Sequence, residues 1–191
     1  MFPIETFQAT LGKAVSIFEK FSLPYHITGG VTTAYYGEPR MTQDIDVVVE
    51  NEGIAAQLEA FLSALSASDF IYSEDAVRLA VEKRELFQLV DQVEALKIDV
   101  YPRELIPGEL SRSERGEVFK GVFLPVVSRA DAAASKLVWI SKGSHKSRRD
   151  LRHIVRTASA DEREMIDRLA GELGLTDLLA EVLNEPDELI E

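Results

Sequence analysis

Residues 26–50, HITGGVTTAYYGEPRMTQDIDVVVE, constrain the fold of this 191-residue chain more than any other segment. They combine a Gly-Gly pair, a short helix-like stretch and an Asp-x-Asp inside an apolar run. Gly29 and Gly30 can end a strand and open a helix, which leaves backbone amides directed at an anion such as a phosphate. Asp44 and Asp46 stand two residues apart in a β-type run, so both carboxylates leave the same face of the strand.

A third carboxylate is expected on a neighbouring strand. Asp99 stands between Ile98 and Val100 in an apolar run, where an unpaired charge would be costly. Such a residue is either hydrogen-bonded within the fold or a metal ligand, and the Asp-x-Asp favours the ligand. The three carboxylates and the Gly-Gly turn together predict a site for Mg²⁺ or Mn²⁺ and a nucleoside triphosphate.

Hydrophobic periodicity predicts an α+β fold, in which a mixed β-sheet is flanked by helices and followed by a small C-terminal helical part. The expected helices are 4–22, 30–36, 53–66, 130–141, 148–158, 161–172 and 176–183. The expected strands are 25–28, 44–49, 70–72, 86–90 and 96–101, with one or two more in 118–127, and 103–117 is expected to be a loop. The predicted domains are a core of residues 1–127 and a helical subdomain of residues 128–191.

Composition excludes several classes of protein. The chain has no cysteine, which excludes disulfides, thiolate zinc sites and cysteine nucleophiles. No apolar run approaches the roughly 20 residues that span a membrane, and the first residues lack the pattern of a signal peptide. The expected location is therefore the cytoplasm, with no membrane partner. A formal net charge of −12 disfavours sequence-blind binding to duplex nucleic acid.

A local basic segment runs against this negative charge. Residues 142–156, KGSHKSRRDLRHIVR, contain six lysines and arginines and one acidic residue, Asp150. Arg149 and Asp150 form either a surface ion pair or part of a substrate contact. Lys136 lies among apolar helix neighbours and is either solvated or bound to a triphosphate. Trp139, the only tryptophan, is expected in the core.

The first motif resembles that of the DNA polymerase β-like nucleotidyltransferase superfamily. That pattern is an apolar strand, Gly-Gly or Gly-Ser, a short helix, an Asp-x-Asp and a later Asp on a neighbouring strand. The chain matches it with Gly29, Gly30, Asp44, Asp46 and Asp99. The resemblance implies a nucleotidyltransferase-like sheet in which the three aspartates are catalytic and bind metal.

A finer resemblance is to the AbiEii-type branch, the nucleotidyltransferase toxins of type IV toxin–antitoxin systems, over roughly residues 20–157. Between the Gly-Gly pair and the Asp-x-Asp, that branch often has a Gly, an Arg and a Thr, here Gly37, Arg40 and Thr42. Downstream it has a helical Lys and a basic stretch ending in Asp-Leu. These positions match Lys136, Arg149, Asp150 and Leu151. The resemblance implies nucleotide contacts from Arg40, Thr42 and Lys136, an acceptor side at Arg148, Arg149 and Asp150, and a cognate antitoxin.

These observations predict a metal-dependent enzyme that moves a nucleoside monophosphate from an NTP to an acceptor hydroxyl. The acceptor hydroxyl is expected on the 3′ end of a tRNA or another RNA. Two alternatives keep the same chemistry, with a small-molecule acceptor of the aminoglycoside type or with a protein hydroxyl. A third is a non-catalytic nucleotide-binding partner protein, which the complete set of aspartates disfavours.

Overall fold

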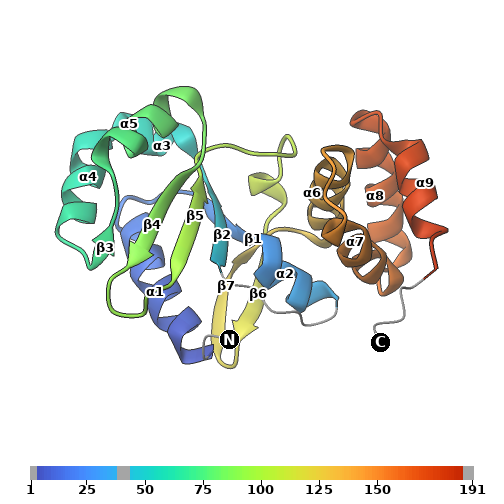
Figure 1. The fold of residues 1–191 in the computed structure, drawn as a ribbon, viewed down its shortest axis with the longest axis horizontal. Helices are drawn as coiled ribbons and strands as arrows, with labels where there is room; N and C mark the ends of the chain where they lie inside the picture. Colours follow the sequence, from blue (N-terminus) through green and yellow to red (C-terminus); the bar gives the residue numbers. More distant parts are fainter. Residues whose placement is uncertain (1–3, 38–43, 187–191) are drawn as a thin grey trace. The chain divides into compact units, whose positions relative to one another are not determined.

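A computed structural model describes residues 4–37 and 44–186 (Figure 1). These residues form two compact units, which are 4–31 with 44–127, and 32–37 with 128–186. The helices are α1 (Ile4–Lys20), α2 (Gly29–Tyr36), α3 (Asn51–Ala56), α4 (Leu58–Ser66), α5 (Glu74–Lys83), α6 (Arg129–Ser141), α7 (Lys146–Arg156), α8 (Ala160–Glu172) and α9 (Thr176–Leu183). The strands are β1 (Tyr25–Thr28), β2 (Asp44–Val49), β3 (Phe70–Ile71), β4 (Phe87–Asp91), β5 (Lys97–Tyr101), β6 (Glu114–Phe119) and β7 (Val122–Val126).

The first unit is built on one mixed sheet with the strand order β3-β4-β5-β2-β1-β7-β6. The central strand β2 is parallel to β5 and antiparallel to β1, while β1 is parallel to β7. β4 and β5 form the antiparallel hairpin that the short segment between them predicts. The predicted α+β class is confirmed.

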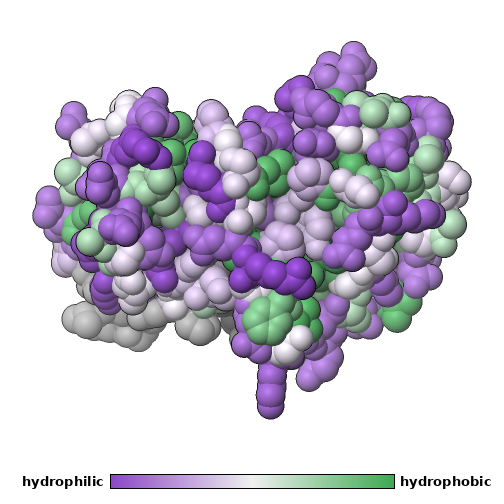
Figure 2. All heavy atoms as spheres, turned by 180° about the vertical axis from the view of Figure 1, so that it is seen from behind, coloured by the Kyte–Doolittle hydropathy of each residue, from purple (hydrophilic) through white to green (hydrophobic). Residues whose placement is uncertain are grey.

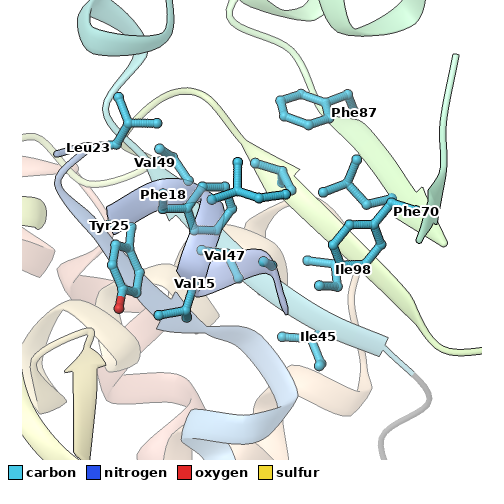
Figure 3. Packing of buried hydrophobic residues seen from close by; sticks show 14 of the residues in the cluster. Val15, Phe18, Leu23, Tyr25, Ile45, Val47, Val49, Phe70, Phe87 and Ile98 are labelled. Carbon is cyan, nitrogen blue, oxygen red and sulfur yellow. The ribbon is translucent and has the colours of Figure 1, made fainter. Parts of the chain in front are cut away.

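The hydrophobic core lies on one face of this sheet. Leu11, Ala14 and Phe18 follow helical spacing along α1 and are fully buried. The Phe18 and Tyr25 rings lie with their centroids 5.5 Å apart. Figure 3 shows both rings beside the valines of β2, with Phe70, Phe87 and Ile98 completing the packing further along the sheet.

β2 separates this core from a polar face. Ile45, Val47 and Val49 are fully buried in the core cluster, whereas Asp44 and Asp46 alternate with them and are only partly buried. Alternate residues of a strand point to opposite faces, so both aspartates lie on the face away from α1. The strand thus anchors the core and presents its carboxylates in a fixed geometry.

Several predicted elements differ from the structure. The helix expected over 53–66 is divided into α3 and α4, because Gln57 leaves helical geometry with φ −125°. Helix α5 was not predicted; its N-cap is Ser73, whose hydroxyl accepts a hydrogen bond from the Ala76 amide. The expected loop over 103–117 contains a 3₁₀ turn at Leu110–Arg112 and the start of β6. Trp139 is 40% exposed, so its expected place in the core is wrong.

The second unit is a helical bundle in which α6 packs against α7 and α8, and α9 against α7 (Figure 1). α6 begins at the predicted N-cap Ser128, whose side chain accepts from the Asp131 amide. Residues 32–37 join this unit, since the Arg129 guanidinium donates to the Tyr36 carbonyl at 3.0 Å. The predicted division into domains at residue 127 stays a prediction.

The surface is largely polar on the face that Figure 2 draws, with hydrophobic residues scattered among the polar ones. Over residues 4–37 and 44–186, no helix has both the length and the apolar character needed to cross a bilayer.

Candidate functional site

The candidate site is the polar face of β2 and β5. Asp46 lies in register with Asp99 across these parallel strands, and Asp44 lies in register with Lys97. Partners in register point to the same face and have Cα atoms about 5 Å apart. The predicted placement of Asp99, on a strand next to the Asp-x-Asp, is confirmed. The roles of the three aspartates in catalysis and metal binding stay predictions.

The Gly-Gly pair packs directly against this cluster. Gly29 opens α2 with φ +66°, a left-handed conformation that favours glycine, and a Cβ at this position would overlap the Asp46 carboxylate. The Gly30 amide donates a hydrogen bond to Asp46. This amide therefore holds a carboxylate, which differs from the expectation that it faces a phosphate. Glycine is needed at position 29 because its backbone lies so close to Asp46.

The surroundings of Asp46 disfavour the charged form of its carboxyl group. Burial raises the pKa of Asp46 above its usual range, and repulsion from Asp44 and Asp99 raises it further. The Tyr101 hydroxyl, 3.3 Å from Asp46 Oδ1, and the Gly30 amide oppose this shift without cancelling it. The hydrogen bonds of Asp46 therefore do not offset its burial and the repulsion from its two neighbours.

Lys97 and Gln88 complete the polar face, and sequence analysis had missed both. Lys97 Nζ lies 2.8 Å from Asp99 Oδ2 and 3.7 Å from Asp44 Oδ2. Its hydrogen bond to Asp99 raises the pKa of Lys97 above the usual value, so the ammonium is charged at neutral pH. Gln88 Nε2 donates to Asp99 Oδ1 at 3.0 Å. The signal was available for Lys97, since it stands two residues before Asp99 and must share its face of β5.

The residues of this face suit a divalent ion in their chemistry. Carboxylate oxygens are the ligands that Mg²⁺ and Mn²⁺ prefer, and the Lys97 ammonium already stands where a cation satisfies Asp44 and Asp99. As the side chains lie, no group of three or more His, Asp or Glu residues in the described ranges is arranged to hold a metal ion. The reason is local, because Asp99 is turned toward Lys97 and Gln88 while Asp46 is held by Tyr101 and Gly30.

The second unit brings together two further candidates. Lys136 of α6 and Asp150 of α7 form a buried ion pair, with Nζ 2.9 Å from Oδ2. Burial of both partners makes this pair different from the solvated lysine and the surface pair that were the alternatives for these residues. Their roles toward nucleotide or acceptor stay predictions.

The basic segment is partly neutralised within its own unit. Arg148 makes ion pairs with Glu181 and Glu185 of the C-terminal region, and Arg152 Nη1 lies 2.6 Å from Glu185 Oε2. Sequence alone suggested a segment opposed only by Asp150, because the acidic partners lie about thirty residues later. The predicted nucleotide contacts Arg40 and Thr42 fall outside the residues that the structure describes.

A family of nucleotidyl transferases and several solved structures are similar to this chain. Residues 26–182 match the family "Nucleotidyl transferase AbiEii toxin, Type IV TA system". No curated protein matches the chain in sequence. The solution structure of the antibiotic-resistance factor ANT(2'')-Ia is similar in fold, with a TM-score of 0.56, 14% identity, and coverage of 92% of this chain and 98% of that one.

Two crystal structures are more distant. An antigenic nucleotidyltransferase-like protein from Paracoccidioides brasiliensis has a TM-score of 0.47 at 16% identity. The match covers 91% of this chain and 90% of that chain. ANT(2'')-Ia in complex with adenylyl-2''-tobramycin has a TM-score of 0.46 at 14% identity, with 95% of each chain covered. The family match spans most of the chain and includes both the carboxylate cluster and the Lys136–Asp150 pair. The chain belongs to the AbiEii family of nucleotidyl transferases and is a nucleotidyltransferase.

Proposed function

We propose that this enzyme transfers a nucleoside monophosphate from an NTP to the 3′-terminal hydroxyl of an RNA such as a tRNA, with pyrophosphate as the leaving group, and that it needs Mg²⁺ or Mn²⁺. The observation that carries the proposal is the register of β2 and β5, which sets Asp99 beside Asp44 and Asp46 on one face. Three carboxylates that repel one another on a folded strand pair are a costly arrangement unless cations join them.

Each residue of the face has a role in this proposal. Asp44 and Asp46 would hold the ion at the nucleotide phosphates, and Asp99 would share a second ion with them. When bound, the divalent ions neutralise the triphosphate and lower the pKa of the acceptor hydroxyl. Asp99 accepts the proton of that hydroxyl, and Gln88 fixes Asp99 Oδ1 for this task. Tyr101 and the Gly30 amide orient Asp46.

The second unit supplies the support for an RNA acceptor. Arg148 and Arg152 are paired with Glu181 and Glu185, so they contribute less charge than the sequence suggests. Lys142 instead lies over the exposed Trp139 ring, with Nζ 5.2 Å from the ring centroid. An exposed indole with an adjacent cation suits a stacked, unpaired base. This is the kind of base that an RNA 3′ end offers.

Incubation with α-labelled NTPs tests the function. The four labelled ribonucleotides are offered in turn with total RNA, with total protein or with aminoglycosides, each with Mg²⁺ and with EDTA. Label is expected in RNA, only with Mg²⁺, and not with an Asp46→Asn variant. Label in protein or in an aminoglycoside would replace the RNA acceptor with that class. Absence of label in every arm would contradict the enzyme's proposed reaction.

The RNA contact has its own test. Trp139→Ala with Lys142→Ala should raise the Michaelis constant for RNA about tenfold, because base stacking contributes about 1–3 kcal/mol. The affinity for NTP should stay unchanged. Equal Michaelis constants in variant and wild type would remove this surface from the acceptor site.

The family also supports a toxin role and a cognate antitoxin. Expression in a bacterial host is expected to arrest growth when the three aspartates are intact, because depletion of functional RNA acceptors stops translation. The Asp46→Asn variant should be tolerated at equal protein levels. Equal growth with both forms would argue against a toxin.

A further inference from the structure

Lys97 occupies an unusual position within the carboxylate cluster. It lies in register with Asp44 across β2 and β5 and two residues before Asp99 on its own strand. Its ammonium is within ion-pair distance of both, at 3.7 Å and 2.8 Å. One cation thus links two of the three side chains that the proposed function gives to metal.

A second lysine–aspartate pair of the same unit shows what is particular about Lys97. Lys13 Nζ lies 2.8 Å from Asp91 Oδ1, the same distance as Lys97 from Asp99. The two lysine side chains are also similarly exposed, at 29% and 34%. Asp91, however, also accepts hydrogen bonds from the Thr10 hydroxyl and two backbone amides, and its pKa is held below the usual value. Lys13 also bridges two carboxylates, since Asp69 Oδ2 lies 3.5 Å from its Nζ. Lys97 differs because its two partners face a third carboxylate, Asp46, and raise the pKa of Asp46 by repulsion.

We propose that Lys97 is a built-in counter-ion that holds Asp44 and Asp99 together before metal binds, and that its ammonium must leave Asp99 for a divalent ion to enter. This inference rests on the proposed function, because it takes the three aspartates as the ion's ligands. The exchange needs only a rotation of the lysine side chain, which is flexible, partly exposed and carried on a rigid strand.

The exchange has a consequence for ion affinity. A divalent ion that displaces an ammonium gains less than one that enters an empty cluster of carboxylates, since the ammonium's own ion pairs are lost. Lys97 therefore lowers the intrinsic affinity for the metal while it stabilises the metal-free fold. Removal of its charge should shift both quantities, in opposite directions.

The test uses Mn²⁺ alone as the probe. Mn²⁺ affinity is measured by calorimetry, and the midpoint of thermal unfolding is measured with and without Mn²⁺. Lys97→Met is compared with wild type and with Lys13→Met, which removes a matched pair away from the cluster. Lys97→Gln is a second variant that keeps a polar group if the methionine variant folds poorly.

Lys97→Met and Lys97→Gln are expected to bind Mn²⁺ about tenfold more tightly than wild type, since a nearby positive charge is removed. Both should unfold at a lower temperature without metal and show a larger Mn²⁺-induced rise of the midpoint. Lys13→Met should also unfold earlier, with the Mn²⁺ affinity of wild type.

Two other results would overturn the inference. Only one of them would also overturn the proposed metal site. Unchanged or weaker Mn²⁺ binding by both Lys97 variants, with normal binding by wild type, would show that Lys97 does not compete with the ion; the proposed metal site would stand. No Mn²⁺ binding by any of the proteins would remove the metal site and the inference together.

Discussion

Asp91 and Asp46 are both carboxylates on strands of one sheet, and their surroundings shift their pKa values in opposite directions. Asp91 ends β4, and its side chain has no exposed surface. Burial acts to raise the pKa of Asp91, but hydrogen bonds from Lys13, Thr10 and two backbone amides outweigh it and hold the pKa below the usual value. Partners within the fold therefore stabilise the charged form of Asp91.

Asp46 lies in the middle of β2, where its hydrogen bonds do not fully stabilise its charged form. The Tyr101 hydroxyl and the Gly30 amide donate to it, yet burial and two neighbouring carboxylates keep its pKa above the usual value. Partners within the fold lower the pKa of Asp91, whereas the raised pKa of Asp46 is the direction expected where like charges gather at a cation site. In the proposed function, Asp91 therefore serves the fold and Asp46 serves the reaction.

The largest expected effect is the loss of activity in Asp46→Asn. The amide cannot neutralise a divalent ion, so transfer should fall by about 10³-fold or more, since a metal's charge stabilisation is worth several kcal/mol. Stability without metal should be equal or higher, because a repelling charge is removed. Rates and thermal midpoints measured on the same preparation check this, and a marked loss of stability would place Asp46 in the class of Asp91.

Gly29→Ala should be the next most damaging change. The new Cβ would overlap the Asp46 carboxylate and would also require a positive φ. We expect transfer to fall at least about 100-fold, because small displacements at a reacting centre have costs of that size. Gly121→Ala is the matched control: Gly121 has φ +77° but no atom within 4 Å of the added Cβ. Equal activity of the two variants would show that Gly29 matters only for its backbone conformation.

Asp91→Asn should show the reverse of Asp46→Asn. Loss of the charge weakens the hydrogen bonds from Lys13, Thr10 and the two amides, and we expect the free energy of unfolding to fall by about 2 kcal/mol. Activity per folded molecule should be unchanged. Urea unfolding gives the free energy and a single-turnover assay gives the activity. A loss of activity in fully folded Asp91→Asn would contradict the prediction that Asp91 contributes to stability and not to transfer.

The smallest effect concerns acid. The pKa of Asp91 is lower in the folded protein than in the unfolded chain, so its stabilisation is complete above the unfolded value, near pH 4. That stabilisation is lost as pH falls through the lower, folded value. The free energy of unfolding, measured from pH 7 down to pH 3, should therefore fall less steeply for Asp91→Asn than for wild type. Parallel curves for both proteins would mean that Asp91 is not held as a charge by its partners.

Much of the first unit could be predicted from the sequence because its signals are local. The alternation of Asp44 and Asp46 with apolar residues fixed their common face, and Asp99 carried the same signal on β5. Lys97 could have been found in the same way. The contacts of Asp46 with Gly30 and Tyr101 could not, because they depend on strand register and on the angle at which α2 leaves β1.

The second unit was less predictable because its contacts join distant segments. The helices follow from their periodicity, but the Lys136–Asp150 pair depends on how α6 and α7 pack. The neutralisation of Arg148 and Arg152 depends on glutamates that follow about thirty residues later. Trp139 was misplaced because hydrophobicity alone does not tell which side of a helix faces the core when small residues line the other.

The central claim is that the face of Asp44, Asp46 and Asp99 binds a divalent cation beside a nucleotide. Diffraction at the manganese absorption edge, from crystals grown with Mn²⁺ and a non-hydrolysable NTP analogue, tests it most directly. We predict an anomalous peak coordinated by Asp44 and Asp46, next to the analogue's phosphates, and none at Asp91. An analogue bound with no peak at these carboxylates, or a peak only elsewhere in the molecule, would contradict the claim.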